Sequence, residues 1–81
     1  MSSHQKLAQA FKQGLALPSK YNATNADSAS LKQWDSVAHL QLVVAIEDEF
    51  GVRLSPADVI ELKSYPAAVA ILERLGAWQD A

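Results

Sequence analysis

Residues 34–51 read WDSVAHLQLVVAIEDEFG, and this stretch decides the fold. Its apolar positions recur at helical spacing, so the sequence predicts a helix from Ser36 to Phe50. Gly51 follows as a natural left-handed cap. Asp35 occupies the N-cap position, where its carboxylate can accept a hydrogen bond from a free backbone N–H.

The apolar surface of this helix is unusually broad. Projected at about 100° per residue, it covers roughly 220° of the circumference, against roughly 100° for an ordinary surface helix. The helix must therefore contact several neighbours or leave apolar surface for a partner. The side chains that form this surface are Val37, Leu40, Leu42, Val43, Val44, Ile46 and Phe50.

Three further helices are expected around it. Before it, Leu7, Phe11 and Leu15 recur every four residues, which predicts a helix over residues 4–14 that ends at Gly14. After it, Ser55-Pro56-Ala57-Asp58 has the residues of a helix start, and this short helix should end near Leu62. Ser64-Tyr65-Pro66 opens the fourth helix, which Gly76 ends. The side chains expected to face inward from it are Ala68, Val69, Ile71, Leu72 and Leu75.

The stretch from residue 19 to residue 33 is polar and reads as one long loop. A loop of that length is unusual in so small a domain. Leu31 and Tyr21 are expected to pin it to the core, and Asp27-Ser28 to start a short helical turn. No segment shows sustained strand alternation, because the only candidate, residues 52–54, is too short to build a sheet. The expected fold class is therefore all-α, in one domain over residues 1–81.

Composition excludes several classes of function. The chain has 81 residues, no cysteine and 49% apolar residues, so a folded domain without disulfides or thiolate metal sites is expected. The net charge of −2, with scattered basic residues, argues against nucleic acid as a partner. The start is polar, and the longest apolar run, Leu42–Ile46, is too short to span a bilayer. We expect a cytoplasmic monomer.

Residues 34–40, together with residues 46–52 (IEDEFGV), resemble the acyl carrier protein family. In that family Asp-Ser-Leu opens the second helix, and an acidic triplet followed by Phe and Gly closes it. Val37 replaces the leucine here, and the likeness extends from about Leu31 to Leu75. An Asp-Ser pair alone is a common helix cap, so the combination carries the resemblance. It implies a four-helix bundle with three longer helices, a short third helix and a long first loop.

The resemblance implies a carrier and not an enzyme. Ser36 would hold a 4'-phosphopantetheine arm through a phosphodiester, attached by a separate phosphopantetheinyl transferase. Asp35 would orient the junction and contact the transferase, and Val37 would lie beside the arm. The arm would carry an acyl group as a thioester to acyl-loading and acyl-processing enzymes of fatty acid, polyketide or related biosynthesis. A helix start suits a phosphate, because its N–H groups are unpaired and its dipole is positive there.

The second helix also resembles the family's docking surface. Leu40 and Val44 would supply apolar contact, while Glu47 and Asp48 would meet basic patches on partner enzymes. The third helix would contribute Asp58, Val59 and Glu61. Acidic residues at this helix end are alternatively a solvated face, although the helix dipole disfavours carboxylates there by a few tenths of a kcal/mol. Ala38 and Gln41 stand where the family often has acidic residues, so a less charged and more apolar partner surface is expected.

Other interpretations of the sequence are possible. Ser28 also follows an aspartate, but no broad apolar helix follows it. Ser36, His39 and Asp35 are the residue types of a hydrolytic triad, yet they lie within one turn, and a packed or half-exposed His39 is the better expectation. His4 and His39 share no metal-ligand spacing. A peptidyl or aminoacyl carrier and an unmodified helical interaction module remain as alternatives.

Overall fold

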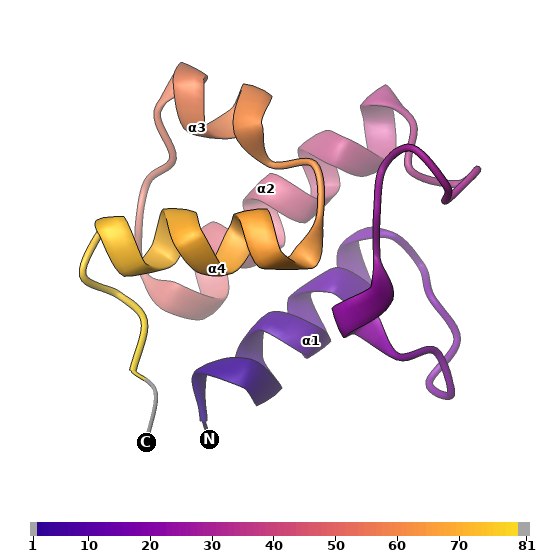
Figure 1. Ribbon diagram of the computed structural model, residues 1–81, viewed down its shortest axis with the longest axis horizontal. Coiled ribbons are helices and arrows are strands. Elements are labelled where there is room, and N and C mark those ends of the chain that lie inside the picture. Colours follow the sequence, from indigo (N-terminus) through magenta and orange to yellow (C-terminus); the bar gives the residue numbers. More distant parts are fainter. Residues whose placement is uncertain (1, 80–81) are drawn as a thin grey trace.

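The helices form where the apolar periodicity places them. In the computed structural model, which describes residues 2–79, the segments surround a shared core (Figure 1). The all-α class is confirmed, and within this range the backbone forms no strand, only an isolated bridge between Asp27 and Ser64. The elements are α1 (Ser3–Gly14), the 3-10 helix η1 (Ala23–Asn25), α2 (Ser36–Phe50), α3 (Pro56–Glu61) and α4 (Tyr65–Arg74).

Side-chain caps set where the α-helices begin. The predicted bounds of α2 are confirmed, with Asp35 as the N-cap and Gly51 in the left-handed region at φ 63°. α1 begins one residue earlier than expected, because Ser2 and Gln5 form a reciprocal capping box. Ser55 caps α3, and Ser64 caps α4.

The core lies where α1, α2 and α4 converge. Leu7, Phe11, Leu42 and Ile46 are almost fully buried, together with Leu72 of α4. No helix of residues 2–79 has both the length and the apolar character needed to cross a bilayer.

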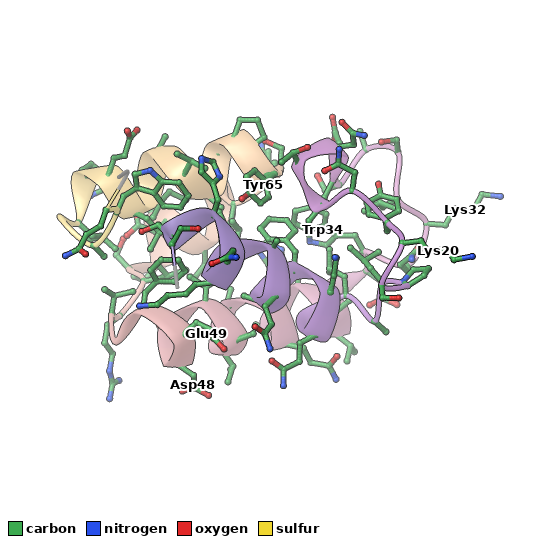
Figure 2. All side chains as sticks on the ribbon, turned by 90° about the horizontal axis from the view of Figure 1, so that it is seen from below. Lys20, Lys32, Trp34, Asp48, Glu49 and Tyr65 are labelled. Carbon is green, nitrogen blue, oxygen red and sulfur yellow. The ribbon has the colours of Figure 1, made fainter. Side chains whose placement is uncertain are left out.

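Aromatic rings extend the core on both sides of Phe11. Its ring centroid lies 5.7 Å from that of Trp34 and 5.3 Å from that of Tyr65, and both side chains point inward in Figure 2. Leu75, which was expected to face inward, is 37% exposed because α4 ends at Arg74, before it.

Gly14 is required for close packing, not for a left-handed cap. A Cβ on this residue would lie 2.6 Å from the Cα of Leu42, so only glycine lets the end of α1 approach α2 this closely. The left-handed residue of the turn after α1 is instead Ala16, at φ 53°. The prediction that α1 ends at Gly14 is confirmed, but the physical reason differs.

The long loop contains more ordered structure than its sequence suggests. η1 interrupts it, and Ala23 and Ala26 are buried. Tyr21 and Leu31 are half-buried against the core, as expected. The turn expected after Asp27 also forms.

Backbone hydrogen bonds tie this loop to the junction between α3 and α4. The N–H of Ser28 donates to the carbonyl of Lys63 at 2.8 Å, and the N–H of Tyr65 donates to the carbonyl of Ala26 at 3.1 Å. Two segments far apart in the sequence are thereby held side by side. These bonds satisfy the N–H of Ser28 and the carbonyl of Ala26 without a strand in the loop.

The two ends of the described chain are also joined. The N–H of Gln79 donates to the Ser3 hydroxyl at 2.8 Å, and the rings of His4 and Trp78 meet edge to face at 4.7 Å. The Tyr65 hydroxyl lies 3.0 Å from Nδ1 of His4. Burial raises the pKa of this hydroxyl, so it stays protonated and remains available as a donor.

Gly14→Ala is expected to lower the free energy of unfolding by about 1–3 kcal/mol, because the new methyl group forces α1 away from α2. Urea denaturation measures the loss. Gln13→Ala is the matched control, since Gln13 is exposed on the same turn. Equal stability of the two variants would contradict the close-packing role of Gly14.

Candidate functional site

Ser36 is exposed as the first residue of α2, at the junction of loop and helix. Asp35 fixes this junction, because its carboxylate accepts the N–H of Ala38 at 2.9 Å and its carbonyl accepts the N–H of His39 at 2.8 Å. The N–H groups of Ser36 and Val37 have no carbonyl partner in a helix that begins here. An exposed hydroxyl beside free donors and a positive helix end fits a phosphate.

His39 holds the start of α2 to its neighbours through both ring nitrogens. The indole N–H of Trp34 donates to Nδ1 at 2.9 Å, and Nε2 lies 2.7 Å from the carbonyl oxygen of Val59. An indole only donates and a carbonyl only accepts, so the geometry assigns a neutral ring protonated at Nε2. The half-buried histidine expected from the sequence is confirmed, and its role is to position the loop and α3 around Ser36.

The hydrolytic triad does not assemble. Both nitrogens of His39 already have partners, so neither is available to take a proton from Ser36. The carboxylate of Asp35 caps the helix and does not orient the imidazole. No group of three metal-ligating side chains comes together in residues 2–79.

A groove of about 560 Å³ opens beside Ser36, between the start of α2 and α3. Asp35 and Ser36 line one side, and Ile60 and Lys63 line the other. Ile60 is 71% exposed, an unusual position for an isoleucine. The groove therefore combines an apolar wall with one acidic and one basic side chain.

The outer face of α2 exposes a continuous apolar stripe. Val37, Leu40 and Val44 are 66%, 61% and 55% exposed, at the spacing of neighbours on one helix face. They line a second groove, of about 640 Å³, between α2 and the end of α1. Asp48 and Glu49 line the same groove, and Asp48 projects outward from α2 in Figure 2. Large exposed aliphatic side chains gathered in one patch are typical of a binding surface.

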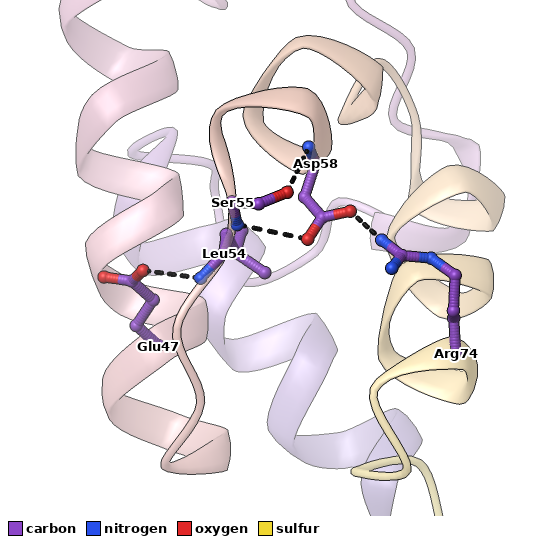
Figure 3. Close-up of polar contacts among 5 residues, drawn as sticks. All are labelled: Glu47, Leu54, Ser55, Asp58 and Arg74. Atoms are coloured by element: carbon purple, nitrogen blue, oxygen red, sulfur yellow. Dashed lines mark hydrogen bonds and ion pairs between the residues drawn. The ribbon is translucent and has the colours of Figure 1, made fainter.

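The acidic residues expected on the docking surface separate into two groups. Asp58, expected to contact partners, is only 2% exposed, so that expectation is wrong. Its carboxylate accepts the N–H of Ser55 at 3.1 Å and pairs with Arg74 of α4 (Figure 3). The physical reason is the capping box, which turns the carboxylate back toward the helix start, where Arg74 covers it.

Glu47 also has a structural contact. Its Oε2 accepts the N–H of Leu54 at 2.9 Å, which ties α2 to the segment before α3 (Figure 3). Asp48 and Glu61 are exposed, while Val59 is half-buried and its carbonyl accepts from His39. The acidic end of α2 is therefore not simply a solvated face.

Ile60 and Lys63 are among the residues of the groove beside Ser36 that sequence reasoning missed. The amphipathic pattern of α3 is too short to show which side of Ile60 is covered. Lys63 stands outside any helix, and the bond from Ser28 to its carbonyl helps to hold it here. The adjacent apolar residues Val59 and Ile60 were the available signal. They lie on different faces of α3, and a helix of six residues cannot bury both faces.

Comparison with known protein families gives one match. Residues 25–72 match the family model described as "Phosphopantetheine attachment site", which covers more than half of the 81 residues. The matched range contains α2, α3 and Ser36. No curated protein and no solved structure gave a significant match.

Asp58→Asn is expected to lower the free energy of unfolding by about 1–3 kcal/mol, because it removes the buried charge that pairs with Arg74. The loss stays moderate because the Arg74 side chain is partly exposed to solvent. Asp48→Asn removes the same charge from an exposed position and should change stability by less than about 0.5 kcal/mol. Chemical denaturation of both variants measures the difference. A stable Asp58→Asn variant would contradict the structural role of Asp58.

Proposed function

Because the chain belongs to the family of carrier domains with a phosphopantetheine attachment site, we propose that it is an acyl carrier protein whose arm is attached to Ser36. Domains of this family carry 4'-phosphopantetheine covalently on a serine, and they are carriers, not catalysts. The observation that supports Ser36 most directly is its exposure at the capped start of a 15-residue helix.

Ser28 is the rival serine within the matched range. It is half-buried, and its backbone N–H is bonded to Lys63. It lies in a turn and not at the start of a long helix, so a phosphate there would gain no helix dipole. These features favour Ser36.

The proposed modification is a phosphoryl transfer from coenzyme A. The Ser36 oxygen forms a bond to the phosphorus that bears pantetheine, and the bond from that phosphorus to the pyrophosphate bridge breaks. Adenosine 3',5'-bisphosphate leaves, and the transferase removes the serine proton. This chain supplies the exposed hydroxyl and the N–H groups at the start of α2, while activation comes from the transferase.

The terminal thiol of the bound arm supplies the thioester chemistry that this cysteine-free chain lacks. We propose that the chain acts in the cytoplasm as a monomer and delivers acyl groups to enzymes of fatty acid, polyketide or related biosynthesis. Trp34-Asp35 before the serine favours an acyl group over an aminoacyl group, because peptidyl carriers more often have glycine there.

Ser36→Ala is expected to abolish the gain in mass when the protein is treated with coenzyme A and a broad-specificity phosphopantetheinyl transferase. Ser28→Ala should load as the wild type does. Intact mass spectrometry measures both, and circular dichroism confirms that both fold. Loading of Ser36→Ala, or loss of loading in Ser28→Ala alone, would overturn the assignment.

The apolar stripe of α2 is the proposed docking surface. Leu40 and Val44 supply apolar contact next to the arm, and Asp48 supplies charge at the far end. Glu47 contributes less than the sequence implies, because it is bonded to Leu54. On α3, Val59 lines the groove beside Ser36, and Glu61 is exposed and could add a charged contact for a partner. Recognition through this face depends more on apolar burial than on charge.

Leu40→Ser is expected to lower kcat/KM for loading by the transferase roughly 3- to 10-fold, because the enzyme loses apolar contact beside Ser36. Leu75→Ser is the control, since Leu75 is also partly exposed but lies beyond the end of α4. Steady-state kinetics with the carrier as the varied substrate gives the ratio. Equal losses in both variants would show that α2 has no special role in docking.

A further inference from the structure

We propose that Lys63 is a positioning residue for the arm, and that its ammonium group pairs with the phosphodiester on Ser36. This inference rests on the proposed attachment at Ser36. It begins from the groove beside that serine, which Lys63 lines from the opposite side. A phosphate on the Ser36 oxygen would enter the groove that this side chain borders.

The local charges leave room for such a cation. Asp35 also lines the groove, and its carboxylate would face the negative phosphodiester. His39 lines it too, but both of its nitrogens are engaged by Trp34 and Val59. Lys63 is the lysine among the residues that line the groove. It therefore provides the positive charge that offsets Asp35.

Lys63 is available for this role. Within residues 2–79, the ion pair found joins Arg74 and Asp58, so no carboxylate of that range holds the ammonium of Lys63. The side chain is exposed, and its flexible four-carbon stem lets the ammonium follow a phosphate that moves with the arm.

The backbone of Lys63 is held while its side chain remains free. Its carbonyl accepts the N–H of Ser28 at 2.8 Å, and the next two residues cap and begin α4. On its other side, Leu62 is buried in the core. The Cα of Lys63 therefore keeps a fixed place beside the groove, and the pair would order the first atoms of the arm against α3.

The test compares holo proteins whose arm on Ser36 has been verified by mass. The readout is the difference in ³¹P chemical shift between the native and the urea-unfolded holo protein. Lys63→Met should lose at least half of the wild-type difference, whereas Lys63→Arg should keep it. Lys32→Met is the matched control, because Lys32 is exposed near Ser36 in sequence but does not line the groove. Salt at about 1 M, where the screening length is about 3 Å, should reduce the wild-type difference.

A second readout uses the wild-type protein alone. The ammonium ¹⁵N resonance of Lys63, assigned in the wild type, should shift on loading, while that of Lys32 should not. An unchanged Lys63 resonance, or a Lys63→Met protein with the full ³¹P difference, overturns the inference and leaves the proposed function standing. Failure of the wild type to load on Ser36 overturns both.

Discussion

The geometry of the site depends on the two hydrogen bonds of the His39 imidazole. This residue joins three parts of the chain that the sequence separates: the end of the loop through Trp34, α2 through its own backbone, and α3 through the carbonyl of Val59. Each partner requires a different nitrogen in a defined protonation state, so the ring cannot rotate without losing both bonds. A short α3 of six residues has little intrinsic stability. Its place beside Ser36 is set by this bond and by the pair between Asp58 and Arg74.

Several polar side chains that look available in the sequence are already committed to the fold. Asp58 and Glu47 satisfy backbone N–H groups at the start of α3, and Asp35 does the same for α2. These bonds replace the regular backbone pairing that short helices and connecting segments lack. The docking surface that we propose is consequently the apolar stripe of α2 with the carboxylates at its far end. The charge of this surface depends on which carboxylates are already bonded within the fold, and not on the net charge of the chain.

Local signals in the sequence predicted the helices well, because caps and apolar spacing act over a few residues. The bounds of α2 and the capping box at Ser55 are of this kind. Features that depend on distant contacts could not be read in the same way. The sequence could not show that Gly14 touches Leu42, that Arg74 covers Asp58, or that Ser28 fixes Lys63, since each pair is 16 to 35 residues apart. Ser36 could be singled out because its signal, a capped and broadly apolar helix, is entirely local.

The contact between Ser3 and Gln79, supported by His4 and Trp78, holds the two ends of the described chain together. Figure 1 shows this junction on the opposite side of the molecule from the first turn of α2. A linker fused at either end would therefore start on the side of the molecule that lies away from the first turn of α2. Such a layout is equally suited to a freely diffusing shuttle and to one tethered within a larger assembly, because neither arrangement obstructs the serine.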